Sequence, residues 1–337
     1  MGTPKICVVI LHWKHLPETL ACLDSLASID YPNRQTIVVD NGSADGDADI
    51  LSRIDGIDLV RNPENLGFTG GVNTGIARSL ELGADYVWLL NSDAATESDV
   101  LRKLVSMAET DDRIGLVSPV IHDSIARDVP EFCLGLYDER ARTINQTADP
   151  DTAKAWQADH PAKVFVPGTA LLIRRSLIDS IGGLDDRFFA YVEDLDYCLR
   201  SIAAGFRNVA VPDAIIYHRF KRPLEEPGAC PPYLHYFITR NKLLLWKKLP
   251  GLTLYPRATL WFFLERLRQI ERMAQYPASI DALLAGLWDG IRGISGPYDP
   301  SRQSPRLLMW AFGRHPSFWI RLIDRKRPHF SGLQRAK

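Results

Sequence analysis

The stretch DYVWLLNSDA, residues 85–94, joins an uninterrupted aromatic and aliphatic run to a short polar segment. A run of this kind is typical of a strand that is buried on both faces, as in a parallel sheet. Ligands of such sheets bind where the strands end, at the carboxyl edge. Asn91 and Asp93 follow the run directly, so we expect both side chains to lie exposed at that edge.

Similar runs recur on both sides of this stretch. Short apolar segments predict further strands at residues 5–11, 35–40, 57–62 and 114–119. Between them, apolar residues at helical spacing predict helices over about 18–28, from about 72, and over 97–109. Alternating strands and helices over about 120 residues predict an α/β fold with a mostly parallel, doubly wound sheet.

The pattern changes in the second half of the chain. Loops and irregular strands are expected from about 125 to 165, and then a strand, a tight turn, a strand and a short helix over 163–185. Beyond about residue 232 the segments read as helices rich in Leu, Trp, Phe and Arg. This predicts a helical part that follows the sheet.

The composition excludes several classes of protein. The 337 residues are 46% hydrophobic and carry a formal net charge of −1, without the basic excess of a nucleic-acid-binding protein. The five cysteines form no CxxC pair, which favours reduced thiols in a cytosolic protein over a zinc site or a disulfide framework. We find no signal peptide and no apolar window of about 18 residues, so we expect no membrane span.

Three polar side chains are candidates for a metal site. Oxygen ligands two residues apart, as in Asn91 and Asp93, suit Mg²⁺ or Mn²⁺. The alternative is a polar turn in which Asp93 caps the next helix. His218 closes the apolar run AIIYH and is either a third metal ligand or a structural histidine.

A glycine-rich segment, NLGFTGGVNTG at residues 65–75, precedes a predicted helix. Its glycines allow backbone to approach a ligand closely, and a helix N-terminus favours anions. The spacing matches neither the dinucleotide-binding fingerprint nor the P-loop. Asp40, at the end of the second strand, either accepts hydrogen bonds from a base or ribose or caps the turn that follows.

The acidic stretch FFAYVEDLDYCLR, residues 188–200, predicts a helix that begins near Glu193. Asp196 and Arg200 are four residues apart and are predicted to form an ion pair on the outer face. Glu193 and Asp194 stand at the helix start, where the helix dipole favours ionised carboxylates. A carboxylate held there is suited to act as a general base, although acids are common at helix starts.

Taken in order, eight segments resemble family 2 glycosyltransferases with the GT-A fold. They are VVILHWK, VVDNGSADG, NLGFTGGVN, NSDA, PGTALLIRR, GGLDDRFFAYVEDLDYCLR, YHR and YFITRN. The resemblance covers about residues 4–245 and is closest to the rhamnosyltransferase-like enzymes of bacterial polysaccharide assembly. It implies a GT-A-type sheet followed by a C-terminal helical extension.

The resemblance also implies a division of the chain. Residues 1–245 would form the catalytic domain, with a nucleotide-sugar-binding half (1–122) and a half that holds the acceptor and the catalytic base (123–245). Residues 246–337 would form the helical, basic extension.

Individual roles carry over from the same resemblance. The implied nucleotide-sugar-binding residues are Trp13, Asp40, Asn41, Gly70, Gly71, Asn73, Asn91, Asp93, Gly168 and Arg240. Trp13 and Asp40 would contact the base and the ribose, and Arg240 would steady the leaving phosphate. Asp93 and His218 would hold Mg²⁺ or Mn²⁺, and Asp194 would be the catalytic base. The family's first metal-motif acid is replaced by Asn91, and the role of Glu193 is left open.

The implied activity is that of an inverting glycosyltransferase. It would move a sugar, rhamnose as the first choice, from a nucleoside-diphosphate sugar such as dTDP-rhamnose to a saccharide hydroxyl. The implied acceptors include a polyprenyl-diphosphate-linked saccharide in the synthesis of cell-surface polysaccharide. One alternative, a sugar-phosphate nucleotidyltransferase, requires a glycine-rich loop where HWKHLPE stands. The other, a non-catalytic sugar-nucleotide-binding protein, is disfavoured by Asp93 and Asp194.

The C-terminal part allows two interpretations. Residues 261–276 and 283–294 mix aromatic and aliphatic residues with arginine, and the last 37 residues carry nine Lys or Arg against one Asp. These features suit either helices on an anionic membrane surface or a helical cap packed on the catalytic domain or on a partner subunit. We therefore expect a cytoplasmic protein, peripheral to the inner membrane under the first interpretation. The sequence does not determine the oligomeric state, and a homodimer is one of the possible states.

Overall fold

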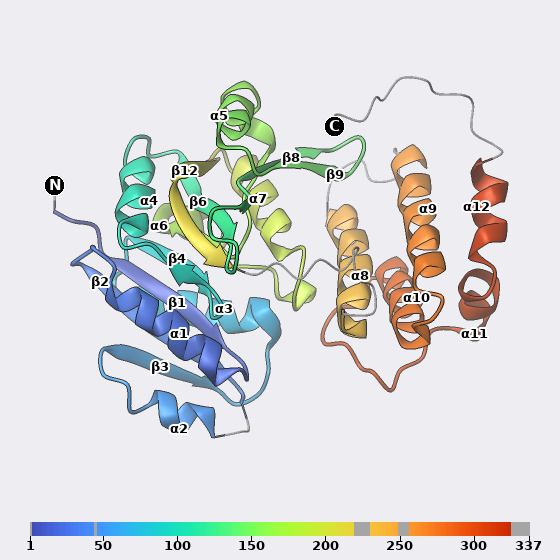
Figure 1. The fold of residues 1–337 in the computed structure, drawn as a ribbon, viewed down its shortest axis with the longest axis horizontal. Coiled ribbons are helices and arrows are strands. Elements are labelled where there is room, and N and C mark those ends of the chain that lie inside the picture. The colour runs from blue at the N-terminus through green and yellow to red at the C-terminus, as the bar shows by residue number, and fades with distance from the viewer. Residues whose placement is uncertain (1, 44–45, 219–229, 249–255, 325–337) are drawn as a thin grey trace. The chain divides into compact units, whose positions relative to one another are not determined.

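The computed structural model describes residues 2–43, 46–218, 230–248 and 256–324. Within it the chain forms two compact units, residues 1–220 and 221–337 (Figure 1). The end of the predicted basic tail, residues 325–337, lies outside the described residues.

A nine-stranded sheet forms the centre of the first unit. The strand order is β3-β2-β1-β4-β11-β6-β12-β5, with β7 paired to β6. The strands are β1 (Ile6–His12), β2 (Arg34–Asn41), β3 (Ile57–Asn62), β4 (Tyr86–Asn91), β5 (Ala95–Thr96), β6 (Ile114–Asp123), β7 (Pro130–Phe132), β11 (Ala170–Arg174) and β12 (Arg207–His218). Strands β3, β2, β1 and β4 are parallel, and β6 and β12 are parallel to each other. Strand β11 is inserted antiparallel between β4 and β6, and the short strands β5 and β7 also pair antiparallel with β12 and β6.

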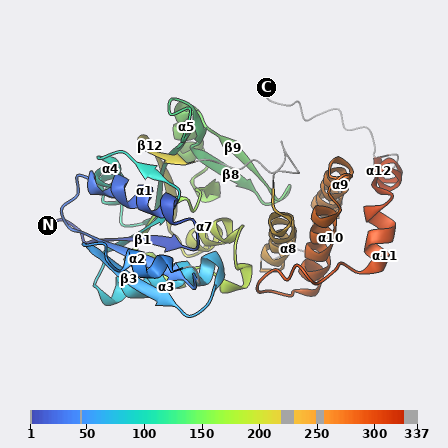
Figure 2. The same ribbon diagram turned by 60° about the horizontal axis from the view of Figure 1, so that its bottom comes forward.

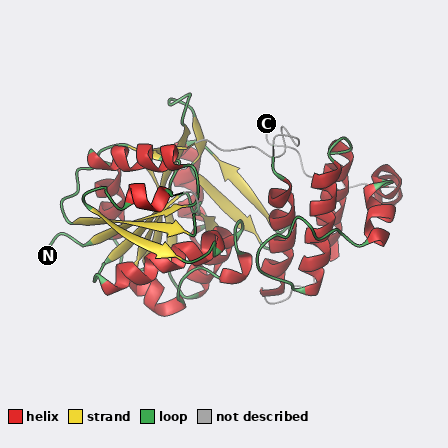
Figure 3. Cartoon of the chain, turned by 90° about the horizontal axis from the view of Figure 1, so that it is seen from below, coloured by secondary structure: helices red, strands yellow, loops and turns green. Residues whose placement is uncertain are grey.

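Helices cover both faces of this sheet (Figure 3). They are α1 (Leu16–Ala27), α2 (Asp47–Leu51), α3 (Gly67–Glu81), α4 (Val100–Ala108), α5 (Pro150–Asp159), α6 (Arg175–Ile181) and α7 (Glu193–Ala203), with short 3₁₀ turns η1 (Pro161–Lys163) and η2 (Asp186–Phe188). The apolar runs that form β1, β2, β4 and β6 are buried along most of their length, whereas β3 is mostly half-buried. The predicted mostly parallel, doubly wound sheet is therefore confirmed.

Two local expectations differ from the structure. Helix α3 begins at Gly67, five residues before the predicted start. Gly70 and Gly71, which were expected to precede the helix, lie inside it. The region from 125 to 165 also contains helix α5 and a small antiparallel sheet, β10-β8-β9. Its strands are β8 (Leu134–Asp138), β9 (Thr143–Thr147) and β10 (Val164–Phe165). The residues Asp149 and Pro150 are a sequence signal for the start of α5, since Asp is a common N-cap and Pro is common at the first helical position. In the structure the Asp149 side chain accepts a hydrogen bond from Thr152 N at 2.8 Å.

The second unit is helical. It consists of α8 (Pro232–Lys248), α9 (Pro256–Arg272), α10 (Pro277–Arg292), α11 (Arg306–Leu308), a π-helical turn η4 (Met309–Gly313) and α12 (Pro316–Asp324). Figure 2 shows α8, α10, α9 and α12 side by side. Their core is the cluster Leu243, Trp246, Phe262, Ile270, Met273, Ile280, Leu283, Leu284 and Leu287. In the part of the chain that the structure describes, no helix is long and apolar enough to cross a bilayer.

The division of the chain at residue 245, implied by the resemblance, cuts through α8. In the structure the whole of α8 belongs to the second unit, because it packs along α10. The functional division at that residue stays a prediction.

Candidate active site at the carboxyl edge of the sheet

The first group of polar side chains stands where β4 and β12 end. Asn91 is the last residue of β4, and His218 is the last residue of β12. His218 Nε2 lies 3.2 Å from Asp93 Oδ1 and 3.5 Å from Asn91 Nδ2. His218 is buried, whereas Asp93 is about half exposed. The structure thus brings the three predicted metal-site residues together, with one open side at Asp93.

The donor set limits which cation these residues fit. Among the described residues no cluster of three His, Cys, Asp or Glu side chains could hold a metal by itself. Mg²⁺ and Mn²⁺ take few protein ligands and complete their coordination with waters and substrate phosphates. Asp93 and His218 therefore fit a cation that is held largely by a bound diphosphate.

The second group is the acid pair at the start of α7. Asp194 Oδ1 accepts a hydrogen bond from Leu195 N at 2.8 Å, and Asp194 Oδ2 accepts one from Gly168 N at 3.3 Å. Burial raises the pKa of Asp194, and these backbone N–H groups act in the opposite direction. A Cβ atom on residue 168 would lie 3.3 Å from the Asp194 Cβ, so the glycine leaves room for the carboxyl.

Glu193 lies deeper than its neighbour. Its side chain is 8% exposed, and no donor among the described residues reaches Oε2 within hydrogen-bond distance. Burial first, and the Asp194 carboxylate second, raise the pKa of Glu193. The pair therefore keeps a proton to a higher pH than two exposed carboxyls would.

Asp196 has a structural role. The sequence placed it on the outer face of the helix, and this is wrong, because Asp196 is buried. Its Oδ2 accepts a hydrogen bond from Arg200 Nε at 2.8 Å, so the predicted ion pair is confirmed. The other Arg200 nitrogens donate to Ile181 O at 3.0 Å and to Gly183 O at 2.8 Å. The pair fastens the turn after α6 to α7.

The turn that leads into the acid pair has an unusual backbone. Phe189, Tyr191 and Val192 have φ angles of 64°, 68° and 72°, in the left-handed region that non-glycine residues rarely adopt. Such strain persists only where surrounding contacts impose it. Part of that restraint comes from α3, because Thr69 N donates to Phe189 O at 3.1 Å. No glycine or asparagine marks this turn, so the sequence gives no signal for it.

Asn73 connects α3 to the beginning of the same segment. Its Nδ2 donates to Leu184 O at 2.8 Å and to Asp186 Oδ1 at 2.7 Å. Its Oδ1 accepts a hydrogen bond from Leu184 N at 2.9 Å. The side chain that the resemblance assigns to the nucleotide site is thus occupied by the segment from 184 to 186.

The glycines of α3 are explained first by packing. A Cβ atom on Gly71 would overlap Leu11 Cδ1 of β1, and one on Gly70 would lie 2.7 Å from Leu66 Cβ. Gly67 N already donates to Asn65 Oδ1, so this N-terminal amide is satisfied within the chain. The nucleotide-binding role of Gly70 and Gly71 stays a prediction.

The ends of β1 and β2 hold the residues assigned to the base and ribose. Asp40 is buried, and its Oδ1 accepts a hydrogen bond from Ser43 N at 3.1 Å, which closes the turn. Trp13 presents much of its ring to solvent, with Lys14 Nζ 4.6 Å from the ring centroid. Trp13 is therefore suited to stack on a base, whereas Asp40 also shapes its own loop.

Asn41 is the centre of a buried amide network that the sequence did not reveal. Its Nδ2 donates to Gly67 O at 2.9 Å and to Asn65 Oδ1 at 3.0 Å. Its Oδ1 accepts hydrogen bonds from Asn62 Nδ2 at 3.0 Å and from Leu66 N at 3.2 Å. These contacts position the start of α3, so Asn41 has a structural role at the carboxyl edge of the sheet.

Arg240 belongs to the second unit. Its guanidinium is buried, donates to Asn241 Oδ1 at 2.8 Å and to Gly296 O, and lies 5.2 Å and 4.9 Å from the Tyr236 and Phe237 ring centroids. Burial lowers the pKa of Arg240. These contacts hold the Arg240 side chain inside the second unit. Its contact with phosphate stays a prediction.

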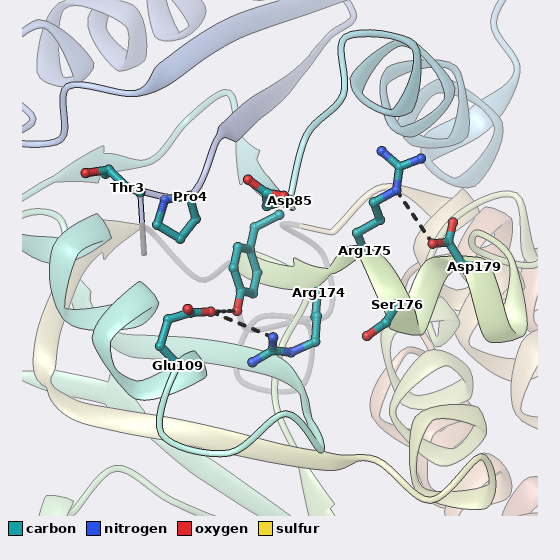
Figure 4. Close-up of a pocket in the computed structure, with 10 residues that line it drawn as sticks. Thr3, Pro4, Asp85, Glu109, Arg174, Arg175, Ser176 and Asp179 are labelled. Carbon is teal, nitrogen blue, oxygen red and sulfur yellow. Dashed lines mark hydrogen bonds and ion pairs between the residues drawn. The ribbon is translucent and has the colours of Figure 1, made fainter.

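A cavity of about 550 Å³ lies at the opposite edge of the sheet, beside the first residues of β1 and β4 (Figure 4). Arg174 points toward Glu109 there, and Arg175 points toward Asp179. The Tyr86 hydroxyl donates a hydrogen bond to Glu109 Oε1. These four charged side chains are thus paired with each other, and Asp85, which also lines the cavity, accepts a hydrogen bond from Lys5 N at 2.7 Å. This cavity does not share residues with the carboxyl-edge site.

Residues 7–182 match the family model described as glycosyl transferase family 2. The chain is 29% identical over 233 residues to the N-acetylglucosaminyl-diphospho-decaprenol L-rhamnosyltransferase of Mycobacterium tuberculosis, covering 64% of this chain and 75% of that protein. It is 22% identical over 271 residues to the dTDP-rhamnosyl transferase RfbF of Shigella flexneri, covering 78% of this chain and 88% of that protein.

The fold is similar to a solved structure of the mannosyltransferase PcManGT from Pyrobaculum calidifontis in complex with GDP-Man and Mn²⁺. The TM-score is 0.52 at 17% sequence identity, over 96% of this chain and 85% of that chain. At this identity the likeness concerns the fold, and it confirms the expected GT-A arrangement.

Proposed function

Because this chain belongs to glycosyl transferase family 2, we propose that it is an inverting, metal-dependent glycosyltransferase whose catalytic base is Asp194. The enzyme would move a sugar from a nucleoside-diphosphate sugar to a hydroxyl group of a saccharide.

One observation supports the proposal above the others: residues 168 and 169 bind both groups of the site. Asn91 N donates to Thr169 O at 2.9 Å, and Gly168 N donates to Asp194 Oδ2 at 3.3 Å. The end of β4, which carries the metal-site residues, is thereby linked to the acid pair through two adjacent residues. A metal-bound diphosphate and a general base have to be neighbours for transfer between them.

The proposed step is a single displacement at the anomeric carbon. Asp194 takes the proton of the acceptor hydroxyl while that oxygen forms the new bond to the anomeric carbon. The bond from the same carbon to the diphosphate oxygen breaks, and the nucleoside diphosphate leaves with the electron pair. Attack from the face opposite the leaving group inverts the anomeric configuration. A Mg²⁺ or Mn²⁺ ion bound by Asp93 and His218 would neutralise charge on the leaving diphosphate.

The environment of Asp194 suits this role. Two backbone N–H groups stabilise its ionised form, so that it can accept a proton. Burial raises its proton affinity, which brings a carboxylate closer to the value that general-base catalysis needs near neutral pH. Burial raises the pKa of Glu193 as well, and Asp194 is the member of the pair whose carboxylate accepts hydrogen bonds from Leu195 N and Gly168 N.

The names of two relatives suggest the donor and the acceptor. One relative is a decaprenol-linked rhamnosyltransferase and another a dTDP-rhamnosyl transferase. We therefore put dTDP-rhamnose first among donors and a saccharide on a polyprenyl diphosphate first among acceptors. The proposed place of action is the cytoplasmic face of the inner membrane, in the synthesis of cell-surface polysaccharide.

The test separates donor binding from transfer. Thermal unfolding is measured with dTDP-, UDP- and GDP-linked sugars, with and without Mg²⁺ or Mn²⁺. A donor at about 100 times its Kd should add roughly 2.7 kcal/mol to the free energy of unfolding. Asp194→Asn should keep that stabilisation and lose transfer by about 10²-fold or more. Asp179→Asn, a change on the exposed surface, is the matched control. Wild-type transfer by Asp194→Asn would remove Asp194 from the role of base.

A further inference from the structure

The last helices of the second unit present large apolar side chains to solvent. Leu307 is 71% exposed, Trp310 60%, Phe318 61% and Leu322 40%. All four lie on α11, η4 and α12, within sixteen residues of one another. Large apolar side chains that gather in this way mark interaction surfaces, whereas single ones are ordinary.

These helices are nevertheless packed on one side. Leu308, Met309 and Phe312 lie against the core of the second unit, and the Phe312 and Trp319 ring centroids are 5.4 Å apart. Trp319 Nε1 donates to Ala311 O at 2.7 Å. The side that is not needed for the core is therefore the side that carries the four exposed residues.

The charge of this segment is mostly positive. Residues 302–324, to the end of α12, contain four arginines, one histidine and a single acid, Asp324. Arg306, Arg314 and Arg321 are exposed and alternate with the apolar residues along the chain. We call Arg306, Leu307, Trp310, Arg314, Phe318, Arg321 and Leu322 the C-terminal face.

Two occupants compete for a surface of this composition. A second copy of the chain, related by a two-fold axis, would put the same surface opposite itself. Arginines would then outnumber acids on both copies, since Asp324 is the single acid of residues 302–324. An anionic bilayer satisfies both properties, because Trp and Phe partition into the headgroup region and arginine binds lipid phosphates.

We propose that the C-terminal face docks the protein on an anionic lipid bilayer, with Leu307, Trp310, Phe318 and Leu322 in the headgroup region and the three arginines against lipid phosphates. The proposal deepens the membrane contact suggested under the proposed function and rests on it. It also moves that contact from the stretches 261–276 and 283–294. Residues of those stretches such as Phe262, Ile270 and Leu284 are buried in the core of the unit.

The experiment is flotation of the full chain with vesicles. Vesicles of phosphatidylcholine with phosphatidylglycerol are compared with pure phosphatidylcholine, and bound protein is measured at several salt concentrations. The wild type should float with the anionic vesicles and release as salt rises. Trp310→Ser/Phe318→Ser should lower the partition coefficient by roughly 100-fold, from the loss of two buried aromatic side chains. Arg306→Gln/Arg314→Gln/Arg321→Gln should lower it by roughly 100-fold, about five-fold for each basic residue.

The matched control is Ile125→Ser, which removes a 72% exposed apolar side chain from the first unit. It should float like the wild type. All variants replace exposed residues, and thermal unfolding checks that they keep the wild-type fold. Vesicle binding is measured separately from sugar transfer. A protein that floats with vesicles and transfers no sugar would contradict only the proposed function. A protein that transfers sugar to a water-soluble acceptor and does not float would contradict only the membrane proposal.

Three outcomes would overturn the inference. The first is a wild type that does not float with anionic vesicles. The second is a Trp310→Ser/Phe318→Ser variant that floats as well as the wild type. The third is a wild-type dimer that becomes a monomer in that variant, with no vesicle binding, which would assign the face to a second copy.

Discussion

Replacing Asn73 with alanine distinguishes the role seen in the structure from the one implied by resemblance. The resemblance places Asn73 in the nucleotide site, whereas the structure uses its amide to hold the segment that leads to Asp194. Asn73→Ala removes three hydrogen bonds and leaves Leu184 N and O without their partner. The effect should therefore appear in stability first.

The magnitude follows from these three contacts. Two of them join the amide to the backbone of Leu184, and each contributes roughly 1 kcal/mol. The third joins it to the Asp186 carboxylate, where partial exposure to solvent reduces the larger value of a charged hydrogen bond. The sum predicts a loss of about 2–3 kcal/mol in the free energy of unfolding of the first unit. The melting temperature should fall by roughly 5–10 °C.

The assay combines urea unfolding with titration of a nucleoside-diphosphate sugar. Asn73→Ala should unfold at lower urea, keep the donor Kd within about two-fold, and transfer sugar more slowly, because the segment before Asp194 has lost its anchor. Asn73→Asp should destabilise more at neutral pH than at pH below about 4, where a carboxylate beside Asp186 becomes protonated. Thr74→Ala is the matched control, since the Thr74 hydroxyl bonds to Gly70 O or Asn62 Oδ1 and not to the segment from 184 to 186.

The opposite pattern would assign Asn73 to the nucleotide site. If Asn73→Ala unfolds like the wild type and loses donor binding, the side chain serves the nucleotide, and its contacts with the segment from 184 to 186 are dispensable.

Three further predictions use other contacts of the site. Glu193→Gln should stabilise the protein increasingly as pH rises: a buried acid with a raised pKa destabilises the fold once pH passes its unfolded value of about 4.3 and until it reaches the folded value. Urea unfolding at a series of pH values measures this, and a difference independent of pH would contradict it. Gly71→Ala should cost about 1–3 kcal/mol through overlap with Leu11, and adding Leu11→Ala should cost less than the sum of the two single changes, as a double-mutant cycle would show. His218→Ala should raise the Kd for Mn²⁺ in the presence of a nucleoside diphosphate by roughly tenfold or more, and an unchanged value in a thermal-shift titration would exclude this ligand.

Much of the fold could be predicted because the signals are local. The runs that became β1, β2, β3, β4 and β6 are apolar and short, and the helices between them have apolar residues at helical spacing. Asn91, Asp93 and Asp40 follow such runs directly, so their place at the carboxyl edge follows from the strand assignment alone.

The antiparallel insertion of β11 could not be predicted, because its apolar sequence suits either direction. The same limit applies to helices of similar composition. Residues 261–276 and 316–324 both mix aromatic residues with arginine, and only packing decided which of them would bury most of its apolar side. A sequence pattern records that a helix has an apolar side, and the neighbours determine what covers it.

By itself the sequence determined the strands, the doubly wound sheet and the polar residues at its edge, since each depends on residues close together in the chain. The tertiary structure alone decided how those residues are held. Asn73 and Leu184 are 111 positions apart, and Gly168 and Asp194 are 26 apart, so no local pattern could pair them. The left-handed backbone of Phe189, Tyr191 and Val192 also has no local sequence signal, and a hydrogen bond from Thr69 N of α3 to Phe189 O helps to hold it.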